Sequence, residues 1–155
     1  MVNDKTINDV LFELLRKHLG ISGVWFIGSR ANNKDIRCNS DWDFIVHCEK
    51  QVLPRLCRDE ELKARATFLK IDLLVDTGGE EISSPWKEKR ILKKELRWAT
   101  LSNNKAKYWG AKSRPEIAEE SLFLSDWEKH AIEHGADDSV DVSGWCVAKR
   151  VWPNE

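Results

Sequence analysis

The sequence lacks any long apolar run. No uninterrupted apolar stretch approaches the roughly 20 residues that a membrane-spanning helix needs. The first ten residues, MVNDKTINDV, also lack the charged and then apolar order of a signal peptide. We therefore expect a cytoplasmic protein without a membrane segment. The 155 residues include 41% hydrophobic and 33% charged residues, a composition that accommodates one compact domain but not two.

The sequence also lacks an excess of positive charge and any paired-cysteine motif. The 25 Lys and Arg residues stand against 26 Asp and Glu, which gives a formal net charge of -1. A general nucleic-acid binder would carry a basic excess, so nucleic acid is not an expected partner and any electrostatic binding must be local. None of the four cysteines belongs to a Cys-x-x-Cys pair, and we expect all of them to be reduced thiols.

The first hundred residues predict helices and strands in alternation. Apolar residues at helical spacing predict a helix over 6–19 that ends at Gly20. Short apolar runs predict three strands, over 23–27, 42–47 and 70–76. Between the second and third strands the pattern fits a helix that begins near Pro54, while residues 66–69 fit either the end of that helix or the beginning of the strand. Ser84-Pro85 then predicts the start of another helix, which ends between residues 98 and 101.

The last third of the chain differs in character. A basic segment over 87–114 precedes an acidic one over 116–141, and the two have opposite charge. We expect a helix over 115–134, and over 140–152 either a terminal strand or an irregular tail that carries tryptophans. The predicted fold is therefore α/β (α+β): a small mixed β-sheet flanked by helices forms a core over 1–101, and a helical, Trp-rich C-terminal extension over 102–155 packs on it.

Three carboxylates stand in or beside the predicted strands. Asp41 and Asp43 flank Trp42, so in an extended strand they share one face and repel each other unless a cation lies between them. A lone Asp-x-Asp is often only a solvent-facing pair at a strand edge. Asp72, however, interrupts an otherwise apolar strand, where an unpaired charge is expensive. Asp76 competes with it, but Asp76 adjoins the Thr-Gly-Gly turn, where an acidic residue is ordinary. We therefore take Asp41, Asp43 and Asp72 as an all-oxygen site for a hard cation, Mg²⁺ above all.

A Gly-Ser pair follows the first predicted strand. Gly28 comes directly after the apolar run, where the absence of a side chain lets backbone N–H groups approach a phosphate closely. Ser29 adds a hydroxyl donor at the start of a helical turn. Gly-Ser alone is usually just a turn, and its position before Asp-x-Asp and a third strand aspartate makes the pattern more specific.

With these motifs the chain resembles the DNA polymerase beta-like nucleotidyltransferase superfamily, and within it the small, stand-alone minimal nucleotidyltransferases. The resemblance covers roughly residues 7–101. One departure is Asn32-Asn33, where small members often have Arg-Gly. The segment over 84–92 looks like the helix that ends many minimal members. The matching motifs are Gly28-Ser29-Arg30-Ala31, Arg37, Ser40-Asp41-Trp42-Asp43 and Asp72.

The resemblance implies the chemistry of a nucleotidyltransferase. Asp41 and Asp43 would hold two Mg²⁺ ions, for which Mn²⁺ can substitute, and Asp72 would ligate one of them and help to deprotonate an acceptor hydroxyl. Gly28 and Ser29 would hold the β- and γ-phosphates of a nucleoside triphosphate, with ATP as the expected donor. Arg30 or Arg37 would be a further phosphate partner.

The resemblance leaves the acceptor open. The first interpretation is a protein hydroxyl, as in antitoxin-like members that modify or mask a helical toxin partner. The second is a small antibiotic such as an aminoglycoside or a lincosamide. The third is a catalytically silent module that binds a partner. Tyr108, the only tyrosine, is a candidate acceptor if the protein modifies itself.

Overall fold

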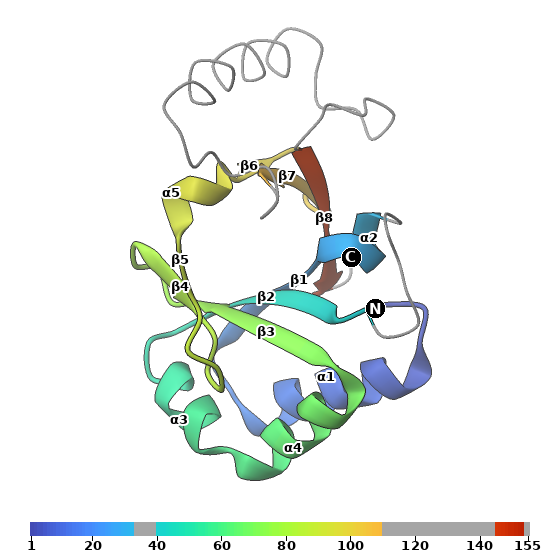
Figure 1. Ribbon diagram of the computed structural model, residues 1–155, viewed down its shortest axis with the longest axis vertical. Coiled ribbons are helices and arrows are strands. Elements are labelled where there is room, and N and C mark those ends of the chain that lie inside the picture. Colours follow the sequence, from blue (N-terminus) through green and yellow to red (C-terminus); the bar gives the residue numbers. More distant parts are fainter. Residues whose placement is uncertain (33–39, 110–144, 154–155) are drawn as a thin grey trace, which may run out of the picture.

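The computed structural model describes residues 1–32, 40–109 and 145–153, which form a mixed α+β fold around one curled sheet (Figure 1). The helices within these residues are α1 (Lys5–Lys17), α2 (Gly28–Asn32), α3 (Val52–Arg58), α4 (Glu60–Leu69) and α5 (Lys93–Leu96). The eight strands, in their order across the sheet, are β5 (Arg90–Leu92), β4 (Glu81–Ser83), β3 (Ile71–Asp76), β2 (Trp42–Cys48), β1 (Ile21–Ile27), β8 (Trp145–Trp152), β7 (Lys105–Trp109) and β6 (Ala99–Thr100).

The predicted N-terminal helix and the three predicted strands are confirmed. Asp4 caps α1 by accepting a hydrogen bond from the backbone N–H of Ile7, and Gly20 follows the helix with φ +102°. β1 begins two residues before the predicted strand, at Ile21. β1 and β2 are antiparallel, whereas β2 and β3 are parallel, so the sheet is mixed. No helix of the described residues combines the length and the apolar character that a membrane crossing requires.

Helices α3 and α4 form the crossover that parallel pairing of β2 and β3 demands. Asp59 separates the two helices and caps α4 by accepting from the backbone N–H of Leu62. The possibility that residues 66–69 already extend into a strand is wrong. They form the last turn of α4, and Lys70 ends that helix in a left-handed conformation with φ 58°.

Two apolar cores lie on the two faces of the sheet. Figure 1 shows α1, α3 and α4 together against one face, where Phe44 and Val46 of β2 pack with them. Ile45 points to the other face and packs with residues of β4, β5, β7 and β8 inside the curl. Helix α5 contacts β7 and so brings the two arms of the sheet together. The alternation predicted for β2 is therefore confirmed.

The helix predicted from Ser84 to residues 98–101 is wrong. The Ser84 hydroxyl accepts hydrogen bonds from the backbone N–H groups of Trp86 and Lys87, which makes a turn, and Trp86 Nε1 donates to the carbonyl of Leu56 at 2.7 Å. Ile91 then pairs with Ile82 in a β4–β5 hairpin and is buried there. Only residues 93–96 are helical, so the helix that the family resemblance implies over 84–92 is absent.

The described strands after residue 102 belong to the same sheet as the strands before it. β8 lies between β1 and β7 and pairs antiparallel with both, which makes the sheet larger than the small sheet that we expected. Of the two expectations for 140–152, the terminal strand is observed over 145–152. The helix predicted over 115–134 lies outside the described residues.

Asn32 fastens β8 to the end of α2. Its side-chain oxygen accepts from the backbone N–H of Val147 at 2.6 Å, and its Nδ2 donates to the Val147 carbonyl at 3.0 Å and to the Gly28 carbonyl at 2.9 Å. The amide group thus imitates a neighbouring strand. These hydrogen bonds are the structural role of Asn32, at a position where small members of the family that the chain resembles often have arginine.

We predict that Asn32→Ala lowers the free energy of unfolding by about 2 kcal/mol, because it leaves both backbone groups of Val147 without their partner. Urea denaturation at neutral pH measures the change. Asn104→Ala is the matched control, since Asn104 is exposed and its side chain makes no hydrogen bond among the described residues. Equal losses in the two variants would contradict this function of Asn32.

Candidate functional site

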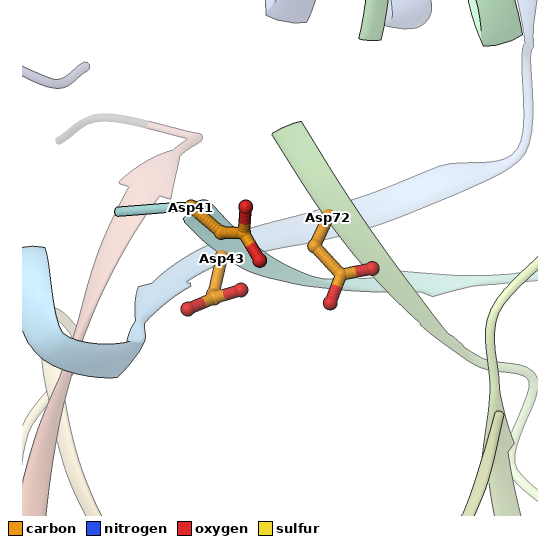
Figure 2. A group of neighbouring side chains, drawn as sticks. All are labelled: Asp41, Asp43 and Asp72. Atoms are coloured by element: carbon orange, nitrogen blue, oxygen red, sulfur yellow. The ribbon is translucent and has the colours of Figure 1, made fainter. Parts of the chain in front are cut away.

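The three predicted carboxylates come together. Asp43 of β2 stands opposite Asp72 of β3 in the parallel register, and Asp41 lies just before β2. One carboxylate oxygen from each residue can be chosen so that all three lie within 4.8 Å of one another. Figure 2 shows the three side chains projecting from the beginnings of the two strands on the same side. Asp41 is exposed, Asp43 is half-buried and Asp72 is only 6% exposed, so the site opens to solvent at Asp41.

The electrostatics of this cluster favour a cation. Burial, and then repulsion by Asp72 and Asp41, raise the pKa of Asp43 to about 6, although Lys89 and Lys87 act in the opposite direction. Lys89 Nζ lies 3.3 Å from Asp72 Oδ2, and Lys87 Nζ lies 3.6 Å from Asp72 Oδ1. These two lysines supply the compensation that a buried Asp72 requires.

The donor set fits a hard divalent cation. All three side chains offer oxygen, which is the ligand that Mg²⁺ prefers. Asp72 Oδ1 is buried and accepts no hydrogen bond among the described residues, so it retains its capacity to bind a cation. The side chains of Lys87 and Lys89 are 59% and 47% exposed, which lets them move away from Asp72 at little cost.

The backbone at Gly28 leaves no room for a side chain. A Cβ at this position would overlap Asp43 Oδ2, and the backbone φ is +81°, which L-residues rarely adopt. The Gly28 N–H, which the sequence assigned to a phosphate, donates to the Tyr108 hydroxyl at 2.7 Å. The Ser29 hydroxyl at the second position of α2 makes no hydrogen bond within the described residues.

Of the two arginines considered as phosphate partners, Arg30 makes other contacts and Arg37 is not described by the structure. Arg30 Nε donates to the Ser40 carbonyl at 3.0 Å, and its guanidinium lies 4.4 Å from the ring centroid of Trp42. Trp42 packs in the core on the opposite face of β2 from Asp43, so these contacts direct Arg30 away from the carboxylates. Arg37 lies outside the described residues.

Asp76, the rejected candidate, has a separate environment. It stands four residues beyond Asp72 and opposite His47 in the β2–β3 register. His47 Nδ1 lies 3.1 Å from its Oδ2, while Lys93 Nζ and the Gly78 N–H bond its Oδ1 at 2.9 and 2.8 Å. Although burial acts to raise it, these hydrogen bonds hold the pKa of Asp76 well below its usual range. The structure thus groups Asp72, and not Asp76, with Asp41 and Asp43.

Sequence reasoning missed the lysines at the site. Lys87 and Lys89 were placed in a helix, where residues two apart do not share a face. In the observed turn they converge on Asp72. The signal was present, since Ser84-Pro85 is as typical of a turn as of a helix start. The hydrogen bond between Tyr108 and Gly28 joins residues 80 positions apart, so no local sequence pattern could predict it.

No protein-family model, curated protein or solved structure matches the chain. The interpretation of the site therefore rests on its residues and their geometry, together with the resemblance of its motifs.

We predict that, with EDTA present, Asp43→Asn is more stable than the wild type at pH 7 and that this difference disappears below about pH 4. The folded-state pKa of Asp43 is raised above its unfolded value of about 3.8, so its contribution to stability is complete below pH 4 and is lost as the pH rises through about 6. After allowance for partial exposure, we expect a gain of about 2 kcal/mol at neutral pH.

Urea denaturation at pH 4, 5, 6 and 7 measures this difference. Asp9→Asn, which removes an exposed carboxylate from α1, is the matched control. A stability of Asp43→Asn that falls relative to the wild type as the pH rises would show that the carboxylate is held by attraction and not by repulsion.

Proposed function

We propose that the protein is a Mg²⁺-dependent nucleotidyltransferase, which moves a nucleoside monophosphate from a nucleoside triphosphate to an acceptor hydroxyl. The observation that carries the proposal is the convergence of Asp41, Asp43 and Asp72 beside Gly28. The mixed sheet, with the Gly-Ser turn after one strand and the aspartates on the next two, is compatible with a nucleotidyltransferase fold. The site of action that we propose is the cytoplasm, where ATP and Mg²⁺ are available.

Asp41, Asp43 and Asp72 would hold the cation. Bound Mg²⁺ would neutralise phosphate charge and stabilise the pentacovalent transition state, and Mn²⁺ would serve in its place. The fold holds the three carboxylates close together, although they repel one another when no ion is bound. Lys87 and Lys89, which pair with Asp72, would turn to the phosphate oxygens when a cation takes their place.

The Gly28-Ser29 turn would receive the phosphates. Ser29 offers as a donor its hydroxyl, which makes no hydrogen bond to another described residue, and Gly28 offers its N–H once a phosphate oxygen replaces the Tyr108 hydroxyl as acceptor. The absence of a side chain at Gly28 leaves room for the Asp43 carboxylate, which must stay close to the phosphates. We do not assign Arg30 to the phosphates, because its contacts are with Ser40 and Trp42.

The transfer is a single displacement at the α-phosphorus. The acceptor oxygen forms a bond to the α-phosphorus, the bond from that phosphorus to the α–β bridging oxygen breaks, and pyrophosphate leaves with the electron pair. The hydroxyl proton passes to the carboxylate of Asp72, whose buried Oδ1 accepts no hydrogen bond from a described residue. Positioning and charge neutralisation supply the catalysis, and no covalent enzyme intermediate is needed.

The acceptor that we propose is a hydroxyl on a protein. Asp41 is exposed, so the carboxylate cluster is open to solvent on one side and a large acceptor can reach it. Tyr108 is a poor acceptor within the chain, because it is only 3% exposed and burial raises the pKa of its hydroxyl well above the usual range. A helical toxin is one partner among the alternatives that the family resemblance leaves open.

We predict that the protein binds at least one nucleoside triphosphate in the presence of Mg²⁺ or Mn²⁺, and that Asp41→Asn and Asp72→Asn each weaken this binding at least about tenfold, because each removes a charged ligand. Calorimetry with ATP, GTP, CTP and UTP, with and without the cation, measures the effect. Asp41 is exposed, so its substitution leaves the core intact.

Asp9→Asn should bind nucleotide as the wild type does. If none of the four nucleotides binds in the presence of either cation, the enzyme proposal fails, and the catalytically silent binding module becomes the better explanation of the chain.

A further inference from the structure

A cavity of about 470 Å³ opens on the same sheet face as the carboxylate cluster. Its apolar lining comes from Ile45, Ile82 and Leu96, and Trp98 adds an aromatic ring. Its polar side chains are those of Ser22, His47, Asp76, Thr77 and Lys93. Apolar walls with a few oriented polar groups are typical of sites for small organic ligands, and the volume lies within their usual range.

His47 presents an oriented ring to this cavity. Its Nδ1 pairs with Asp76 Oδ2 at 3.1 Å, which fixes the ring and leaves Nε2 as the nitrogen for a ligand. The rings of His47 and Trp98 meet in a T-shaped arrangement, with ring centroids 6.2 Å apart. An aromatic ring and a hydrogen-bonding edge therefore lie side by side, and together they suit a flat heterocycle.

The charges near His47 are already balanced within the protein. Asp76 accepts from Lys93 Nζ, from the Gly78 N–H and from His47, so its carboxylate is saturated and Lys93 is paired. Asp76 is the one carboxylate among the described lining residues and it is paired, so it offers no free charge to a polycation such as an aminoglycoside, and a phosphate would meet its negative charge. The cavity thus favours an uncharged ring with polar edge atoms.

The position of the cavity relates it to the carboxylates. His47 and Asp76 lie four residues beyond Asp43 and Asp72 along the parallel strands β2 and β3, on the same face. At about 3.3 Å per residue, the two pairs are separated by about 13 Å. A ribose and a purine ring can extend over this distance from phosphates held at the carboxylates.

We infer that the cavity lined by His47 and Trp98 binds the nucleobase of the nucleoside triphosphate. This inference rests on the proposed function and deepens it, because it assigns the recognition of the base to residues outside the carboxylate cluster. His47 Nε2 would bond a polar atom on the edge of the ring, and Trp98 would cover the ring.

The test separates binding of the base from binding of the phosphates. Calorimetry measures the Kd of Mg²⁺–ATP and of Mg²⁺–tripolyphosphate, which lacks the base, for the wild type and for His47→Ala. We expect His47→Ala to weaken ATP about tenfold, the equivalent of one hydrogen bond, and to leave tripolyphosphate within twofold. Asp76 retains Lys93 and Gly78 in this variant, so no buried charge is left unpaired.

A second variant fills the cavity without disturbing the core. Ser22 is exposed and lines the cavity, so Ser22→Trp should also weaken ATP and spare tripolyphosphate. Leu19→Trp is the matched control, because it adds a similar ring at a residue that is 75% exposed and outside the cavity lining.

The outcomes distinguish the two proposals. If the wild type binds ATP and both His47→Ala and Ser22→Trp bind it with the same affinity, the base site is wrong, while the nucleotidyltransferase proposal stands. If the wild type binds ATP and tripolyphosphate with equal affinity, the base site is likewise wrong and the nucleotidyltransferase proposal stands. Wild-type protein that binds neither tripolyphosphate nor any of the four nucleoside triphosphates overturns the proposed function, and the base site with it.

Discussion

The parallel register of β2 against β3 is the constraint on which the site depends. It sets Asp43 beside Asp72 at the beginning of the two strands and His47 beside Asp76 at their end. Because alternate residues share a face, both pairs project to the inside of the curl, with Ile45 and Leu74 between them. A slip of one residue would turn the carboxylates into the core formed with α1, α3 and α4, where no cation could reach them.

The curl of the sheet brings lysine side chains to the buried carboxylates of β3. The turn before β5 brings Lys87 and Lys89 to Asp72, and α5, directly after β5, brings Lys93 to Asp76. Toward the other edge of the sheet, β7 and β8 lie beside β1. There the Tyr108 hydroxyl accepts from the Gly28 N–H, and the Val147 N–H donates to the Asn32 side chain. The described strands of the C-terminal third thus hold the Gly-Ser turn in place.

Local patterns in the sequence were sufficient to predict some of these features and not others. Each short apolar run is visible within one segment of the sequence, so the strands could be predicted, and the Thr-Gly-Gly turn beside Asp76 was a local reason to favour Asp72. The β4–β5 hairpin could not, because Ile91 and Leu96 fit an amphipathic helix equally well until Ile82 is known to lie opposite Ile91. The contact of Arg30 with Trp42 also depends on the tertiary fold, since the two side chains come from different elements.

The comparison of Asp72 with Asp76 shows how one strand can carry two kinds of carboxylate. Both lie on β3, on the same face, and they are 6% and 5% exposed, so burial does not distinguish them. Asp76 has a donor for each oxygen, one of them from the backbone of the adjacent turn, and is thereby fixed. Within the described part of the chain, the partners of Asp72 are two exposed lysine side chains, and one of its oxygens accepts no hydrogen bond.

A buried carboxylate whose partners are flexible can exchange them for a stronger cation, whereas one that is held by the backbone cannot do so without breaking the turn. Asp43, with its raised pKa, stands directly beside the exchangeable member of this pair. The arrangement therefore places the mutually repelling carboxylates at the end of β2 and β3 where Asp41 is exposed, and the hydrogen-bonded Asp76 at the other end, beside the cavity.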